Sequence, residues 1–437
     1  MTKHSNNYLY SFIILFVILS FFTLPNKILA APNWTNILST LPLKPNSTDS
    51  GYTSFSPPTA GNYYTDPVFG TKIWRLTDCQ SEGKSIAGTN IYPYKHPFSA
   101  DSNKIYVHVQ GNGDIHKIFN TSDATLYKVL SLPHLSGDFA LFDPIDTTKM
   151  WYFNGNVLYS TDISKSTPVE TIEHTFSGYS NLVLEDISQS GDLFLFDGNS
   201  KIVTWRKSTN TTSYINQSIH SSYNECTITK ETGSTPRVLV LWDSGSYVYD
   251  WNLTNGTYLG KANAPHHDGG NGEWYFEQWS LVIPFNRDCI YKASFNNPTS
   301  QTIVACFTSD GNHAMSMHVS NDANNGWFVT DNYTGYEDMM PSSSYWYAFT
   351  NEIVLARISD GATWRLAHHR TRYNYGGGGA PTYWQQPHAV LSPNGKYVVY
   401  KSTFNNRGYT DAYLLEIPTD PSTSQPSPPT GLVITKP

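Results

Sequence analysis

The sequence predicts an all-β protein folded as a β-propeller of seven blades. Aromatic residues make up 14% of the 437-residue chain, charged residues only another 14%, and glycine is frequent. Aromatic and β-branched residues favour strands, whereas Asn, Gly and Ser favour the turns between them. Short strand-like runs recur with turn signals along most of the chain. Repeated units of about 40–50 residues that contain short strands are typical of propeller blades.

One hairpin motif occurs near both ends of the predicted domain. His388 precedes a Ser-Pro-Asn-Gly turn at 392–395 and an alternating Tyr/Val strand, and His96 precedes a similar turn and strand. Asn-Gly favours a tight hairpin because it tolerates positive φ. Each histidine lies eight residues before a lysine, Lys104 or Lys396. This self-similarity, nearly 300 residues apart, indicates a repeat architecture.

Residues 1–31 have the pattern of a secretory signal. A weakly basic start is followed by an apolar run from Tyr8 to Leu24 and by small residues at Ala30 and Ala31, where cleavage is expected. An uncleaved membrane anchor is the alternative, although the run is slightly short of the ~20 residues of a spanning helix. No later segment is apolar enough to cross a bilayer. We therefore expect a secreted or extracytoplasmic protein with no membrane segment after cleavage.

The charge and composition narrow the class of partner. The formal net charge is −7, and no basic face is indicated, so nucleic acid is excluded as a partner. The remaining expectation is a monomer that binds a carbohydrate polymer or a protein ligand.

The chain divides into four regions. Residues 32–66 contain Pro42, Pro45, Pro57 and Pro58 without a strand pattern and read as an irregular lead-in. The propeller is expected over 67–418, and the Pro/Ser/Thr-rich tail over 419–437 has the composition of an extended linker. Seven groups of strands are predicted at 92–130, 135–172, 178–215, 222–261, 265–312, 313–371 and 384–418.

An isolated strand at 72–77 suggests how the ring closes. The last group shows only three strands, and a propeller blade has four. Pairing of 72–77 with 411–417 would complete that blade and remove an exposed sheet edge. Two β-sandwiches in tandem are the alternative, but they predict neither the isolated first strand nor similar hairpins at both ends.

Four cysteines follow the predicted signal: Cys79, Cys226, Cys289 and Cys306. Four cysteines permit three pairings. The runs around Cys289 and Cys306 resemble neighbouring strands joined by an Asn-Asn-Pro turn, which favours a disulfide between these two. A zinc site of four thiolates is disfavoured because the sequence has no CxxC pair.

Histidines cluster in the last three groups. They occur at 266–267, 313, 318, 368–369 and 388, mostly at or just before the expected innermost strand of a blade. Such histidines would converge on one mouth of the central channel, where imidazoles suit a divalent metal or proton transfer near neutral pH. The alternative is that each caps a loop or fills the channel by hydrogen bonding.

The last group also carries a family resemblance. Gln385-Gln386-Pro387-His388, the following Leu391-Ser392-Pro393-Asn394-Gly395 and the later Asp411-Ala412-Tyr413-Leu414 resemble the last blade of TolB-type propellers and, more specifically, of oligogalacturonate lyases. That resemblance implies a seven-bladed enzyme that cleaves uronic-acid sugars by β-elimination at a manganese site. The signature covers about a tenth of the chain and is shared with many propellers that lack this activity.

The resemblance implies a set of site residues. Metal ligands in that family come from a histidine on an earlier blade and from a Gln-x-x-His-x-His run, which Gln385 and His388 match. His313 or His318 sits about where the earlier ligand would be, and His266 or His267 about where the catalytic base would be. The resemblance thus implies one divalent metal, Mn or Ca.

One position departs from the family run. Its final histidine is Val390 here, so one ligand is lost unless His369 or a water replaces it. This departure favours a propeller without that metal chemistry.

Arginines beside the histidine pair offer a second element of such chemistry. Arg370 and Arg372 could hold a uronate carboxylate in bidentate fashion. Tyr373 and Tyr375, before the glycine run 376–379, could stack on sugar rings, or the whole segment could be a solvated loop. No Gly-x-Ser-x-Gly nucleophile motif occurs, which disfavours a serine hydrolase. Two hypotheses follow: a metal-assisted polysaccharide lyase and a non-catalytic binding or scaffold propeller.

Overall fold

The computed structural model describes most of the chain between residues 55 and 417. The described ranges are 55–88, 95–111, 113–135, 140–230, 235–260, 267–270, 273–280, 287–308, 315–320, 326–334, 349, 351–371, 385–404 and 408–417. The predicted signal and the predicted C-terminal tail lie outside them. These ranges hold 29 strands and one short 3-10 helix, η1 (Gln217–Ile219). No helix within them is long and apolar enough to cross a membrane.

The strands form seven antiparallel sheets, which are the predicted seven blades. Six sheets have four strands each, and the strand order in every one follows the chain. Their bounds are β3 (Lys84–Gly88), β4 (Lys104–Gly111), β5 (Ile115–Asn120), β6 (Leu126–Leu130); β7 (Leu141–Phe142), β8 (Lys149–Asn154), β9 (Val157–Asp162), β10 (Glu170–Thr175); β11 (Val183–Ile187), β12 (Leu193–Gly198), β13 (Lys201–Arg206), β14 (Thr211–Asn216); β15 (Tyr223–Ile228), β16 (Val238–Trp242), β17 (Gly245–Tyr249), β18 (Thr257–Gly260); β19 (His267–Gly269), β20 (Glu273–Ser280), β21 (Arg287–Ser294), β22 (Asn297–Thr308); β23 (Met315–Ser320), β24 (Trp327–Thr334), β25 (Glu352–Arg357) and β26 (Thr363–His368).

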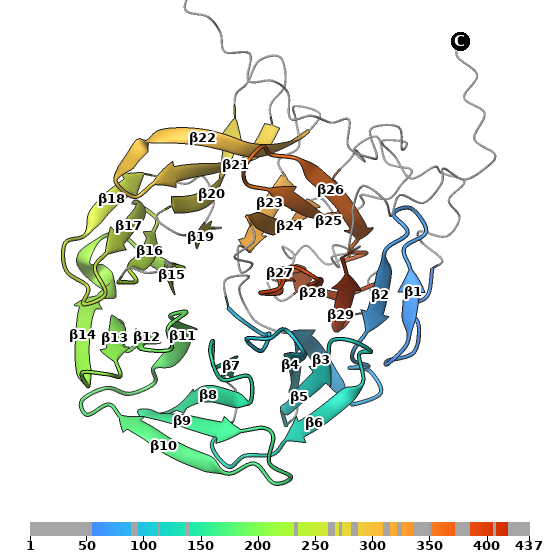
Figure 1. Cartoon of the computed structure of the whole chain (residues 1–437), viewed down its shortest axis with the longest axis horizontal. Coiled ribbons are helices and arrows are strands. Elements are labelled where there is room, and N and C mark those ends of the chain that lie inside the picture. Colours follow the sequence, from blue (N-terminus) through green and yellow to red (C-terminus); the bar gives the residue numbers. More distant parts are fainter. Residues whose placement is uncertain are drawn as a thin grey trace, which may run out of the picture.

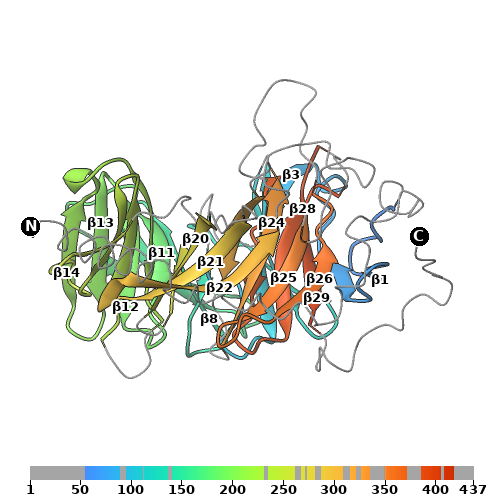
Figure 2. The same cartoon turned by 90° about the horizontal axis from the view of Figure 1, so that it is seen from above.

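The seventh sheet contains both ends of the described chain. Its order is β1 (Tyr63–Thr65), β2 (Lys72–Arg75), β29 (Asp411–Glu416), β28 (Tyr397–Ser402) and β27 (Val390–Leu391). Figure 1 shows the sheets arranged around a centre, with β7, β11, β15, β19 and β27 innermost and β6, β10, β14 and β18 on the outside. Figure 2 shows the ring from the side. The chain is therefore a β-propeller, as the sequence predicts.

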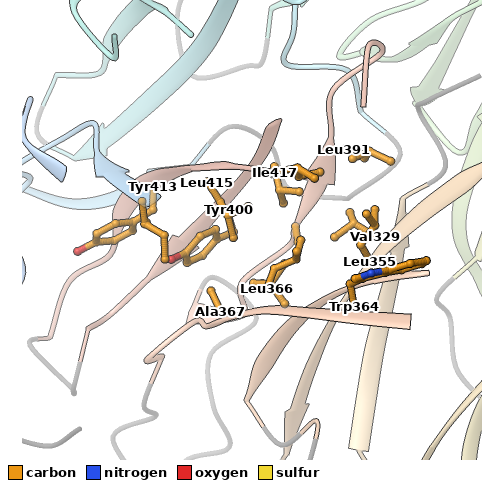
Figure 3. Packing of buried hydrophobic residues seen from close by; sticks show 14 of the residues in the cluster. Val329, Leu355, Trp364, Leu366, Ala367, Leu391, Tyr400, Tyr413, Leu415 and Ile417 are labelled. Carbon is orange, nitrogen blue, oxygen red and sulfur yellow. The ribbon is translucent and has the colours of Figure 1, made fainter. Parts of the chain in front are cut away.

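Apolar cores lie between neighbouring blades. The strands alternate buried side chains between their two faces, so each blade packs on the blade before it and the blade after it. Figure 3 shows the core between the sixth and seventh blades, where Leu355 and Trp364 face Leu391, Tyr400 and the end of the last strand.

Ring closure by the first strand is confirmed. Ile73 pairs with Leu415 and Arg75 with Tyr413 in an antiparallel ladder between β2 and β29. A buried ion pair reinforces the ladder, because the Arg75 guanidinium lies 2.8 Å from Asp411 Oδ2. The last blade thus takes its fourth strand from the start of the chain.

Two strand assignments differ from the sequence prediction. β1 lies in the 32–66 segment, which was expected to lack strands; its three residues pair with 72–74 as a fifth, outer strand, too short to give a periodic pattern. The first blade begins with β3, not at residue 92. Residues 89–103 separate β3 from its partner β4, so no compact hairpin signal marks the pair.

The predicted disulfide is confirmed. Cys289 on β21 and Cys306 on β22 are directly opposite in register, with 4.1 Å between their Cα atoms, and their sulfurs are bonded. Cys79 and Cys226 are buried thiols outside any disulfide.

Loss of this disulfide should lower stability measurably. The bond closes a loop with a sequence separation of 17, for which chain entropy predicts a contribution of about 3 kcal/mol. We expect the double variant Cys289→Ala/Cys306→Ala to have a free energy of unfolding about 3 kcal/mol lower than that of the wild type, measured by urea unfolding. Wild-type protein treated with reductant should match the variant; equal stability of oxidised wild type and variant would contradict the prediction.

Candidate functional site

His318 lies on β23, the innermost strand of the sixth blade, opposite Asp331 on β24. Its Nδ1–H donates to Asp331 Oδ1 at 2.6 Å, and its backbone N–H donates to the same oxygen at 3.2 Å. A carboxylate that accepts from Nδ1 fixes the tautomer in which the neutral ring carries its lone pair on Nε2. This is the arrangement in which an imidazole serves as a base or a ligand.

His388 reaches the same point from the seventh blade. Its ring lies edge-to-face against the ring of His318, with 4.4 Å between centroids and an 84° interplanar angle. His388 has a φ of +47°, which side-chain-bearing residues rarely adopt and which clusters at functional sites. Its Nε2 lies 3.2 Å from Gln386 Oε1, so this amide orients the ring.

Asp331 connects the two blades. While Oδ1 accepts from His318, Oδ2 accepts the backbone N–H of Ala389 at 2.7 Å. The side chain of Asp331 is completely buried. One carboxylate therefore sets both the tautomer of His318 and the place where the chain bearing His388 enters the last blade.

Lys401 on β28 is a buried cation near this carboxylate. Burial lowers its pKa from 10.5 to about 7, and the negative charge of Asp331 opposes that change. The amine therefore exchanges its proton close to neutral pH. A lysine with such a pKa can take part in proton transfer.

His369 interacts electrostatically with Asp331, and both nitrogens of its ring are hydrogen-bonded to the backbone. The backbone N–H of Thr371 donates to its Nδ1 at 3.0 Å, and its Nε2–H donates to the carbonyl oxygen of Asn332 at 3.2 Å. Burial lowers its pKa to about 4, so the ring is neutral at pH 7. With both ring nitrogens engaged, His369 does not supply the ligand that Val390 lacks.

Arg370 lies in a neighbouring buried cluster. Its side chain is inaccessible and its guanidinium sits 4.7 Å from the ring centroid of Phe55. It also interacts with the buried groups of Tyr64 and Asp66. The residue has a φ of +56°, which turns the chain at this point. Arg370 thus ties the segment before β1 to the sixth blade, and we leave it out of the proposed site.

The remaining predicted site residues are placed only in part. His266, His313 and Arg372 lie outside the described residues. His267 forms part of β19, with only its backbone described. Gln385 is half-buried, three residues before His388, and the amide on His388 is that of Gln386 instead. The structure therefore brings together His318 and His388 and places Arg370 in a separate buried cluster. The side chains of His266, His267, His313 and Arg372 lie outside the described residues.

Val390, which replaces the final histidine of the Gln-x-x-His-x-His run, is a core residue. Its side chain is fully buried in the apolar core that joins the last blade to the first, together with Val399 and Leu414. Within the ranges that the structure describes, no three His, Cys, Asp or Glu side chains are arranged to hold a metal ion. The described donors do not fit such an ion by themselves, and we assign no chemical step to one.

Sequence reasoning missed Asp331, Gln386 and Lys401. Asp331 and Lys401 each interrupt an otherwise apolar or aromatic strand pattern, Phe-Val-Thr-Asp and Tyr-Val-Val-Tyr-Lys. A charged residue inside a buried strand is a signal for a paired or functional group. Gln386 carries no comparable signal.

The two hairpin histidines are not equivalent in space. The turns share a hydrogen bond in which a serine hydroxyl accepts a backbone N–H five residues later, from Lys104 to Ser99 and from Tyr397 to Ser392. His96 precedes its serine by three residues and His388 by four, so the repeat aligns His96 with Ala389. The repeat thus reflects the turn, not a shared histidine position.

Comparisons with known proteins support the fold. No family model and no curated sequence matches the chain. Among solved structures, the oligogalacturonate lyase of Vibrio parahaemolyticus superposes with a TM-score of 0.56 at 15% identity, over 82% of this chain and 96% of that one. The shared feature is the propeller fold. U3-55K gives a TM-score of 0.49 at 7% identity over 81% and 100% of the two chains, and the Neurospora crassa Pan2 WD40 domain gives 0.46 at 11% over 75% and 90%.

Proposed function

We propose that this protein is an extracellular carbohydrate-binding propeller that cleaves uronate-containing sugars by β-elimination at the His318–His388 pair. The observation that carries the proposal is this pair itself: two imidazoles from adjacent blades in ring contact, one with its tautomer fixed by a buried carboxylate. The structural likeness to an oligogalacturonate lyase supports it. The disulfide supports the compartment, because disulfides persist in oxidising environments.

The residues fit the proton movements of such a reaction. β-Elimination removes the proton beside the uronate carboxylate, forms a carbon–carbon double bond and breaks the bond to the leaving glycosidic oxygen. In the proposal His318 accepts the proton at Nε2, while Asp331 holds the ring and stabilises the imidazolium that forms. Lys401, which gains and loses its proton near pH 7, supplies a proton toward the leaving oxygen. The elimination is redox-neutral and needs no other reactant.

The test is release of unsaturated sugars by the purified full-length chain. Polygalacturonate and alginate serve as substrates, and the ultraviolet absorbance of the new double bond reports the reaction. We expect His318→Ala and His388→Ala to lower the rate at least ~100-fold, the usual range for loss of an acid or base group. His134→Ala is the matched control, because that histidine is half-exposed and contacts Glu170 on an outer strand. Full activity of the His318 variant would contradict the assignment.

Asp331→Asn tests the orienting carboxylate separately. Asn keeps the volume but not the charge, so the Nδ1–H tautomer of His318 is no longer imposed. We expect kcat to fall by about 10²–10⁴-fold with little change in KM. Thermal unfolding of the same variant shows whether the fold persists. An unchanged kcat would contradict the role of Asp331.

A specific observation also favours a non-catalytic binding propeller. His318 and His388 are 1% and 2% exposed, and Asp331 binds the backbone of the last blade. These features are also those of a structural hydrogen-bond network that joins the sixth and seventh blades. If the wild type binds uronate polymers in pull-down assays but releases no unsaturated sugar, with or without added Mn²⁺ or Ca²⁺, the binding-module function is the better one.

A further inference from the structure

A cavity of about 310 Å³ lies at the centre of the first three blades and the seventh. It is formed by Phe98, which precedes the turn before β4 in the first blade, and by Phe142 and Ile187, which end the innermost strands of the second and third blades. Pro393 of the seventh blade also lines it. None of its lining residues belongs to the His318–His388 site. His388 and Pro393 lie beyond opposite ends of β27 (Val390–Leu391).

Apolar side chains form one part of the wall of this cavity. Phe98, Leu141, Phe142 and Ile187 line it and are each at most 5% exposed, so their positions are fixed by the blade cores. A largely preformed apolar wall with few polar groups is typical of a small-molecule site. The lining also presents polar atoms, and the polar side chains among its residues are those of His96 and Gln189.

His96 lies beside the buried carboxyl group of Asp186. Its Nε2 lies 3.9 Å from Asp186 Oδ1. Asp186 is held rigidly, because Oδ2 accepts the Thr227 hydroxyl and the Ile228 backbone N–H, both at 2.7 Å. The His96 side chain keeps 24% exposure, so part of its ring is presented to the cavity.

Size and polarity select one class of ligand. A cavity of about 150 Å³ holds a benzene molecule, so this one accommodates a substituted aromatic ring. A carboxylate or an ammonium group would lose its hydration against the apolar side chains of Phe98, Phe142 and Ile187. A phenolic hydroxyl carries no charge and both donates and accepts, so it matches an imidazole in either tautomer.

We propose that this cavity is a binding site for a small phenol, with the aromatic ring between Phe98, Phe142 and Ile187 and the hydroxyl on His96. The rings of Phe98 and Phe142 offer the edge and face contacts that aromatic ligands prefer. The site is independent of the proposed lyase chemistry.

Binding of p-cresol to the full-length protein tests the proposal. We expect saturable 1:1 binding by ligand-observed NMR, with a Kd on the order of 0.1–1 mM for a ligand of this size. Ala100 lines the cavity from a half-buried turn position, so Ala100→Trp should fill it and weaken binding at least tenfold. Ser166→Trp places the same side chain on a remote exposed loop and should bind like the wild type.

His96→Phe separates the polar contact from the apolar walls. This variant should lose about tenfold in p-cresol affinity while its affinity for toluene stays within about twofold. If either variant fails to fold, Gln189→Trp at the half-buried rim gives a second means of obstruction. Absence of saturable p-cresol binding, equal binding by the Ala100 and Ser166 variants, or equal losses for p-cresol and toluene in His96→Phe would overturn the proposal.

Discussion

The Asp411→Ala variant should unfold with a free energy about 3–5 kcal/mol lower than that of the wild type. Asp411 is completely buried at the closure of the ring. Its Oδ2 accepts from Arg75 Nε and Nη2 at 3.1 and 2.8 Å, and its Oδ1 accepts from the Thr77 hydroxyl and the Cys79 backbone N–H at 3.0 and 2.9 Å. Alanine leaves a buried guanidinium and two donors without that carboxylate.

Asp360→Ala is the matched control for this experiment. Asp360 also pairs with an arginine, Arg357, but on an exposed turn with both side chains at least 40% accessible. Solvent-exposed pairs contribute about 0–1 kcal/mol. Urea unfolding followed by tryptophan fluorescence measures both variants. If Asp411→Ala loses no more stability than Asp360→Ala, the buried pair does not hold the ring closed.

Lys401→Met should raise the free energy of unfolding at pH 7 by about 2–4 kcal/mol. Burial lowers the pKa of Lys401 from 10.5 to about 7, and a difference of one pKa unit corresponds to about 1.4 kcal/mol. The full difference corresponds to about 5 kcal/mol, which already includes the attraction to Asp331 and sets an upper limit on the gain. Methionine has a similar length without the desolvated amine.

The change of the free energy of unfolding with pH tests whether the buried amine of Lys401 is destabilising. Between pH 7 and 10.5 the unfolded chain binds a proton at Lys401 that the folded chain does not, so wild-type stability rises with pH through this window. Below pH 7 both states bind the proton and the unfavourable contribution is constant. Lys401→Met should lack the rise, while Lys396→Met, on an exposed turn, should retain it. A methionine variant less stable than the wild type at pH 7 would show that the amine is net stabilising.

Long-range pairing could be predicted from the sequence where one element lacked a partner. The strand at 72–77 had no neighbour and the last group lacked a strand, so their pairing followed from the need to remove sheet edges. The Cys289–Cys306 bond followed from the spacing of two strand-like runs. β1 could not be predicted, because three residues are too few for a periodic signal.

The candidate site could be predicted only in outline. His318 and His388 meet because both lie at innermost strands of adjacent blades. The family resemblance implies Gln385 as a metal ligand, and this stays a prediction; the amide that contacts His388 is that of Gln386, one residue later. Arg370 was expected near a substrate, but its positive φ directs it into the buried cluster with Phe55. The charged Asp331 inside a buried strand signals a paired group, but its hydrogen-bond partner on another blade cannot be predicted from the local sequence.

Closure of the ring also fixes the order in which the chain can mature. Arg75 and Asp411 are 336 positions apart, so the contact cannot form until nearly all of the described chain has been synthesised. Until β29 has been synthesised, the edge of β2 that will pair with it has no hydrogen-bonding partner. Contacts this distant in sequence slow folding and prolong the exposure of unpaired strands. β2, one of the first described strands to be synthesised, is therefore among the last to pair within the ring, and its free edge must avoid other partners until β29 is made.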